Sequence, residues 1–130
     1  MGILFLTLQE ALDLHKDQIR RYGGIEGIRD VALLHSALAT PQATFGGSFL
    51  HEGLYAMAGA YLFHIVQNHP FLDGNKRTGA LAAIVFLGLN GIELDADQDE
   101  FEKLVLEVAQ GTADKKKVAG FFKENSQQSP

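Results

Sequence analysis

The chain has no cysteine and no excess of basic residues. Without cysteine it can form no disulfide, no thiolate nucleophile and no cysteine-based zinc site. Its 130 residues include 11 lysines and arginines against 16 aspartates and glutamates, a formal net charge of −5. That charge argues against binding nucleic acid through a broad basic surface, so we expect no DNA binding by this chain itself.

The N-terminal segment lacks the features of a membrane anchor or a targeting signal. Residues Met1–Leu6 are apolar but too few to span a membrane, and no basic stretch precedes them as in a signal peptide. The myristoylation pattern also fails, because Leu6 stands where serine or threonine is required. We therefore expect a cytoplasmic protein with no membrane partner.

The remaining composition is that of an ordinary globular domain, with 46% hydrophobic and 21% charged residues. Its length predicts a single domain over residues 1–125, followed by a frayed tail at 126–130. Apolar residues recur at helical spacing, and there is no long alternating pattern, internal repeat or linker. We expect an all-α fold, a compact bundle of about six helices, with a small β-hairpin near residues 42–50.

Capping and breaking residues predict where these helices begin and end. Thr7–Glu10 reads as a capping box, and Asp30 as the N-cap of a second helix that closes before Pro41. The fourth apolar segment, 78–89, is hydrophobic almost all round, which predicts a place in the middle of the domain. The expected helices cover residues 8–22, 31–40, 54–68 and 78–89, with two more around 101–110 and 118–122.

The segment with the most chemical content lies between the third and fourth of these helices. It reads His69-Pro70-Phe71-Leu72-Asp73-Gly74-Asn75-Lys76-Arg77-Thr78. A helix N-terminus presents unpaired N–H groups and a partial positive charge, so it is a natural seat for phosphate. A neutral imidazole supplies a base, a carboxylate can hold a divalent metal, and two cations can clamp anionic oxygens.

Simpler interpretations of the single residues do not account for the whole string. Lys76 and Arg77 taken alone would be a solvated helix start, but cations there oppose the helix dipole by a few tenths to about 1 kcal/mol. A bound polyanion explains why both stand at that end. The nearby His51-Glu52 pair begins like a zinc-protease helix but has Tyr55 where the second histidine must be. There is no P-loop and no protein-kinase motif, and Lys115–Lys117 is expected to be a solvated helix face.

The string resembles the motif of the Fic/Doc family in its Doc (death on curing) form, His-x-Phe-x-Asp-x-Asn-Lys-Arg. The resemblance extends to the chain length, to the opening Phe5-Leu6-Thr7 and to the Ala43–Gly47 segment. Fic enzymes, which transfer AMP to a protein hydroxyl, have His-Pro-Phe-x-x-Gly-Asn-Gly-Arg-x-x-Arg. Here Lys76 replaces the second glycine and Ala80 the last arginine. Both departures are those of the Doc branch.

The resemblance implies a role for each residue of the motif. His69 would be the general base that takes the proton of a target serine or threonine hydroxyl, and Asp73 would hold Mg²⁺ against the phosphates. The backbone at Gly74 and the side chain of Asn75 would form the anion cradle. Lys76 and Arg77 would neutralise charge on the transferred group and so take part in catalysis. Phe71 would anchor the loop in the core, and residues 42–50 would be a flap that docks the target.

The activity implied is that of the toxin of a toxin–antitoxin pair. Doc toxins are regarded as kinases that use ATP to phosphorylate elongation factor Tu, which blocks translation. They are held by a small antitoxin protein whose C-terminal helix fills a groove on the toxin. Two alternatives stay open: a Fic-type AMP transferase, and a catalytically silent module that only binds a partner. The sequence does not identify the protein substrate, the modified residue or the cognate antitoxin.

Ser48–Gly53 matches the Ser/Thr-x-x-x-Glu-Gly pattern of the inhibitory helix found in many Fic proteins. The match lies just before the third expected helix, whereas inhibition requires a separate helix over the phosphate site. We expect the match to be accidental.

Overall fold

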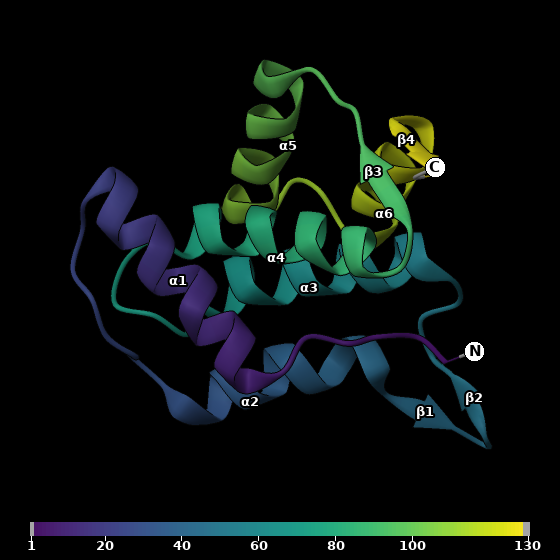
Figure 1. Ribbon diagram of the computed structural model, residues 1–130, viewed down its shortest axis with the longest axis horizontal. Helices are drawn as coiled ribbons and strands as arrows, with labels where there is room; N and C mark the ends of the chain where they lie inside the picture. Colours follow the sequence, from purple (N-terminus) through teal and green to yellow (C-terminus); the bar gives the residue numbers. More distant parts are fainter. Residues whose placement is uncertain (1, 129–130) are drawn as a thin grey trace.

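The computed structural model describes residues 2–128, and in them six α-helices form a bundle with two small antiparallel sheets (Figure 1). This confirms the all-α prediction. None of these helices is both long enough and apolar enough to cross a lipid bilayer. In chain order the elements are α1 (Leu8–Tyr22), α2 (Val31–Ala39), η1 (Thr40–Gln42), β1 (Thr44–Phe45), β2 (Ser48–Phe49), α3 (Leu54–Asn68), α4 (Asn75–Leu89), β3 (Ile92–Leu94), α5 (Gln98–Gln110), α6 (Lys115–Glu124) and β4 (Ser126–Gln128).

Short polar side chains cap four of the six helices. Thr7 closes the expected capping box with Glu10 at the start of α1. Asp30, Asp97 and Asp114 each accept a backbone N–H at the starts of α2, α5 and α6. The starts of α3 and α4 are different, because each has a glycine as N-cap and no side-chain hydrogen bond. The first-turn N–H groups of α4 are therefore not satisfied by a cap.

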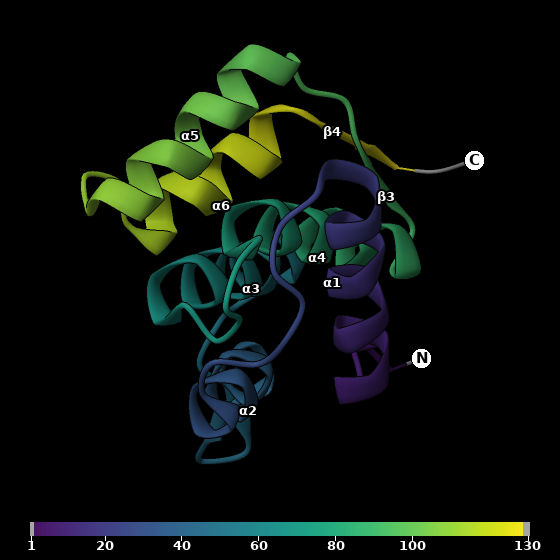
Figure 2. The same cartoon turned by 90° about the vertical axis from the view of Figure 1, so that its left-hand side faces the viewer.

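The centre of the molecule is the antiparallel pair α3 and α4, with α2 on one side of it and α5 and α6 on the other (Figure 2). Gly79 makes the pair close: a Cβ there would stand 2.9 Å from Val66 Cγ2 and 3.2 Å from the Leu62 carbonyl oxygen. A larger residue at this position would force the two helices apart. The position and orientation of the motif loop, which joins these helices, are thus determined by the most tightly packed part of the core.

The fourth helix differs from its prediction in two ways. It begins at Asn75 rather than at Thr78. The sequence pattern missed this first turn because its residues are polar and do not extend the apolar spacing. It is also buried on one side only: Ala83 and Phe86 are fully buried, whereas Ile84 is 37% exposed and Leu89 39% exposed. The all-round apolar character predicted a place in the middle of the domain, which the central α3–α4 pair confirms, but it did not predict an exposed side. One apolar face of α4 looks into a cavity instead.

The two small sheets both lie on the right in Figure 1, β3 and β4 above the α3–α4 pair and β1 and β2 below it. The expected hairpin is present, with Thr44 opposite Phe49 and Phe45 opposite Ser48. The expected frayed tail is wrong for residues 126–128, which form β4 and pair with β3; residues 129–130 lie outside the described residues. The buried apolar side chains of the described residues form one core cluster.

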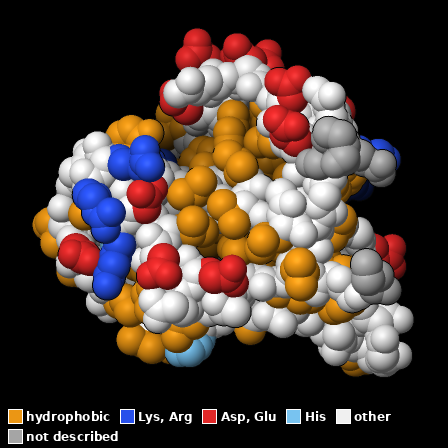
Figure 3. Space-filling view, in the orientation of Figure 1, with side chains coloured by type: hydrophobic (Ala, Val, Ile, Leu, Met, Phe, Trp, Pro, Cys, Tyr) orange, Lys and Arg blue, Asp and Glu red, His pale blue; other side chains and the backbone are white. Residues whose placement is uncertain are grey.

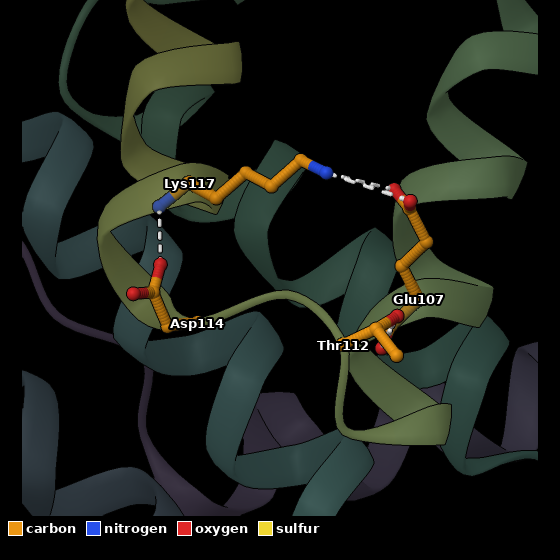
Figure 4. A network of polar contacts seen from close by, with 4 residues as sticks. All are labelled: Glu107, Thr112, Asp114 and Lys117. Carbon is orange, nitrogen blue, oxygen red and sulfur yellow. Dashed lines mark hydrogen bonds and ion pairs between the residues drawn. The ribbon is translucent and has the colours of Figure 1, made fainter.

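The turn between α5 and α6 is held by a polar network (Figure 4). Asp114 caps the backbone N–H of Lys117 at 2.8 Å, and the Lys117 ammonium reaches a Glu107 carboxylate oxygen at 3.3 Å. The Thr112 hydroxyl donates to the Glu107 carbonyl. The expected solvated lysine face is wrong for Lys115, whose Nζ lies 3.1 Å from Nε2 of both His51 and His64, whereas Lys117 is exposed in its surface ion pair.

Candidate active site

The motif loop runs from His69 to Gly74, between the end of α3 and the start of α4. His69 is the C-terminal cap of α3 and is exposed. Its backbone is left-handed (φ 49°, ψ 54°), and among the described residues it is the one non-glycine residue with a positive φ. Such a backbone is strained for a residue with a Cβ and persists only where neighbours hold it.

Asn75 closes the loop onto itself from the first turn of α4. It is 6% exposed, its Oδ1 accepts the Phe71 N–H at 3.0 Å, and its Nδ2 donates to the Phe71 carbonyl at 3.0 Å. The same Nδ2 lies 3.3 Å from His69 Nδ1. The side chain is therefore occupied with the loop and the imidazole. What Asn75 offers an anion is its backbone N–H.

Phe71 anchors the loop in the core as the motif implies, and is 1% exposed. Its ring stacks face to face on His15 of α1, with centroids 3.8 Å apart and planes 5° apart. Nε2 of His15 also lies 2.8 Å from the Asp73 carbonyl oxygen. His15 thus ties α1 to the loop. Its sequence position shows only a polar residue within an amphipathic helix, so pattern reasoning missed it.

The first turn of α4 presents unpaired donors. Gly74, the N-cap, is left-handed (φ 76°), and the first helical bond runs from the Thr78 N–H to the Gly74 carbonyl at 2.9 Å. The preceding N–H groups, those of residues 75–77, have no acceptor within the helix. A Cβ on residue 74 would stand 3.1 Å from Ile19 Cδ1, and the positive φ would strain a residue that has one, so both favour glycine here. This helix start can bind phosphate oxygens.

Asp73 is exposed and lies at the edge of that helix start. Its Oδ1 accepts the Gly74 N–H at 2.9 Å, and its Oδ2 accepts the Ile25 N–H at 3.2 Å. Each oxygen keeps a second lone pair, so the carboxylate can still bind a cation. No group of three metal-binding side chains occurs in residues 2–128. The site therefore fits Mg²⁺ held by one carboxylate together with phosphate and water, which is how that ion is bound beside nucleotides.

A cavity of about 810 Å³ opens beside this helix start. Lys76 and Arg77 stand at its polar end, where the Arg77 guanidinium lies 4.6 Å from the centre of the Tyr22 ring. Its other walls are mostly apolar and come from α4 and α5. They are formed by Ala80, Leu81, Ile84, Phe101, Val105 and Leu106. Figure 3 shows apolar side chains across the hollow, acidic ones along its upper edge and cations at its left.

The segment beside the motif loop is 23–30, which joins α1 to α2. Its Gly27 carbonyl accepts the Leu72 N–H at 3.0 Å, and the Arg29 N–H donates to the Pro70 carbonyl at 2.7 Å. Ile28 and Phe71 form an isolated antiparallel bridge. Sequence reasoning missed this pairing, because three glycines and two isoleucines among charged residues give no strand pattern.

The hairpin expected to act as a flap lies at the other end of the bundle (Figure 1). The ring of Phe49 contacts Phe5, which in turn contacts Phe86 near the far end of α4. Phe86 lies 11 residues beyond Asn75, which is about 16 Å along a helix. The hairpin therefore lies toward the end of α4 that is remote from the motif loop. The Ser48–Gly53 pattern shares this location.

The chain is similar to known proteins of one family. The family model described as "Fic/DOC family" matches residues 5–87. The chain is 42% identical over 100 residues to "Toxin Doc" of Mycolicibacterium smegmatis, covering 75% of this chain and 77% of that protein. It is 31% identical over 106 residues to "Protein kinase doc" of Escherichia phage P1, covering 82% of each. The chain belongs to the Fic/DOC family, as the motif from His69 to Arg77 had indicated.

Proposed function

We propose that this protein is the toxin of a toxin–antitoxin pair and that it phosphorylates a serine or threonine of a target protein, with ATP as donor. One observation carries the proposal: the uncapped start of α4 lies between a histidine and two cations and opens into a cavity large enough for a nucleotide. The names of the two relatives support it. We propose elongation factor Tu as the target. We also propose that the reaction takes place in the cytoplasm, because both ATP and that target are found there.

In the proposed reaction the target hydroxyl oxygen attacks the γ-phosphorus of ATP. A new O–P bond forms, the bond from the γ-phosphorus to the bridging oxygen breaks, ADP leaves, and the hydroxyl proton passes to His69. The N–H groups at the start of α4 bind the phosphate oxygens, and Lys76 and Arg77 neutralise their charge. Mg²⁺, held by Asp73, would add a further positive charge at the phosphates. Positioning and charge stabilisation of this kind are what phosphoryl transfer requires.

The contact of His69 with Asn75 constrains this step. Because Asn75 Nδ2 is a donor, its approach to Nδ1 at 3.3 Å favours the neutral tautomer with the proton on Nε2. To accept the hydroxyl proton at Nε2, the imidazole must be in the other neutral tautomer, with its own proton on Nδ1 and without the Asn75 contact. The contact is long, so its loss costs little, and contacts of this kind rearrange when substrate binds.

Lys76 favours phosphate transfer over AMP transfer. In AMP-transferring relatives a glycine at this position lets the nucleotide approach the backbone closely. A lysine side chain at the rim of the cavity fills that space and supplies charge for a terminal phosphate. We propose phosphotransfer for this reason, with AMP transfer as the alternative.

The apolar part of the cavity suits a small antitoxin protein. Ile84 and Leu106, which are 37% and 47% exposed, line this part of the cavity. Glu102 lines the same wall, and Asp99 and Glu100 begin α5. An amphipathic helix with apolar residues toward α4 and cations toward α5 would cover this surface and close the phosphate site.

The proposal is tested by transfer of label to purified elongation factor Tu. With Mg²⁺ present, ATP labelled at the γ-phosphate should label the target, and ATP labelled at the α-phosphate should not. His69→Ala should slow transfer by roughly 100- to 10,000-fold, the usual effect of losing a general base. Expression of the wild-type protein should arrest bacterial growth, and His35→Ala, which changes an exposed histidine of α2, should behave as wild type. Full activity of the His69 variant would refute its role as the base.

A further inference from the structure

The catalytic geometry proposed above depends on a left-handed His69, and nothing in the sequence around it makes that conformation favourable. The residue is not glycine, and it is followed by Pro70, which restricts the backbone of the residue before it to extended forms. Its φ of 49° and ψ of 54° are outside that range. A strained backbone of this kind needs an external hold.

The hold comes from Arg29, on the segment that lies beside the motif loop. Its Nε donates to the His69 carbonyl at 2.6 Å, and one terminal nitrogen donates to the Asn68 carbonyl at 2.8 Å. These carbonyls are at the C-terminal end of α3, where they lack helical partners and carry partial negative charge. A rigid guanidinium can bridge two neighbouring carbonyls, which an ammonium cannot do with fixed geometry.

The backbone of the same segment strengthens the hold. The Arg29 and Asp30 N–H groups both donate to the Pro70 carbonyl, at 2.7 and 3.1 Å. Three consecutive carbonyls, those of residues 68–70, therefore accept bonds from residues 29 and 30. Asp30 is also the N-cap of α2, so the residues that donate these hydrogen bonds are attached to a helix.

We propose that Arg29 is a positioning residue: by bridging the carbonyls of Asn68 and His69 it holds the His69 backbone left-handed, so that the imidazole stays near the start of α4. Arg29 takes part in neither ion pair found in residues 2–128, Arg21–Asp17 and Lys117–Glu107. Its guanidinium instead donates hydrogen bonds to the carbonyls of Asn68 and His69. Without Arg29 the end of α3 frays, His69 relaxes to the extended form that Pro70 favours, and the imidazole moves away from the start of α4.

The inference rests on the proposed function, and two measurements separate them. The first is steady-state phosphate transfer by Arg29→Ala. We expect kcat to fall about 10- to 100-fold, the usual effect of a misplaced catalytic group. KM for ATP should not change, since Arg29 does not line the cavity. Guanidinium ion at low concentration should restore part of the lost rate, and Arg29→Lys should retain part of it. Arg21→Ala, which removes an exposed ion pair of α1, is the matched control.

The second measurement is NMR of His69, which needs no activity. In the wild type the backbone carbon shifts should report a left-handed residue and the ring ¹⁵N shifts one dominant tautomer. In Arg29→Ala the backbone shifts should become those of an extended residue, with averaged ring shifts, while thermal unfolding stays cooperative. Left-handed shifts in the variant would overturn the inference, as would a wild-type kcat. If the wild type transfers no phosphate, the proposed function fails, and the NMR comparison alone decides whether Arg29 holds His69.

Discussion

The side chains of His69, which begins the motif loop, and of Asn75, which follows it at the start of α4, have opposite environments. Asn75 is buried and bonds to both main-chain groups of Phe71, whereas His69 is exposed on a strained backbone. The motif identified both residues, but assigned the side chain of Asn75 to the anion. Spacing alone does not show that this side chain is already occupied. His15 and Arg29 belong to no sequence motif, because the groups that they contact are 58 and 40 residues away in the chain.

Asn75→Ala should therefore affect folding as well as activity. It leaves the buried N–H and carbonyl of Phe71 without partners, which should lower the free energy of unfolding by about 1–3 kcal/mol. Urea unfolding measures this loss. Asn125→Ala, which removes one bond to the Phe121 carbonyl at the end of α6, is the matched control and should cost less. An Asn75 variant as stable as wild type would show that the loop does not depend on these bonds.

Among the elements, α4 and β4 show what hydrophobic pattern can and cannot predict. The pattern located the six helices, because amphipathic faces repeat with the helical period. It did not reveal β4, since Ser126–Gln128 is polar and becomes a strand only by pairing with β3, more than 30 residues earlier. It also could not distinguish an enclosed α4 from one that lines a cavity, because Ile84 would be apolar in either case.

The contact between α3 and α6 should make stability depend on pH. Lys115 lies between His51 and His64. Burial, and then the charges of Lys115 and His51, lower the pKa of His64 from 6.5 to about 4. Burial and Lys115 also lower the pKa of His51, although the Thr40 backbone opposes this. Both histidines are thus neutral acceptors for Lys115 in the folded protein.

A lowered folded-state pKa means that the unfolded chain binds more protons in this range. The free energy of unfolding is therefore at its full value above pH 6.5, the unfolded-state pKa of His64. It decreases as the pH falls toward about 4, the pKa of His64 in the folded protein. The urea midpoint should fall over this range for the wild type and less for His64→Gln, which cannot titrate. His35→Gln on α2 is the control, since that histidine is exposed. An equal fall in all three proteins would contradict the account.

At the scale of the whole molecule, charge and apolar surface are separated around one hollow (Figure 3). Lys76 and Arg77 stand at the phosphate end, and acidic residues line the α5 side. The motif predicted the cations, while the hollow itself follows from how α1, α4 and α5 pack and could not be predicted from local sequence. A nucleotide and an antitoxin helix would both need this space, so binding of the second should exclude the first.

The central claim, transfer of phosphate rather than AMP, is tested most directly by the intact mass of the product. The protein should be incubated with ATP, Mg²⁺ and elongation factor Tu, with Lys103→Ala on exposed α5 as control for Lys76→Gly. Wild type and the Lys103 variant should each add the mass of one phosphate to the target. Lys76→Gly should lose that activity, because a charge beside the transferred group is gone. A target carrying the mass of AMP after incubation with the wild type would contradict the account and favour the Fic-type reaction.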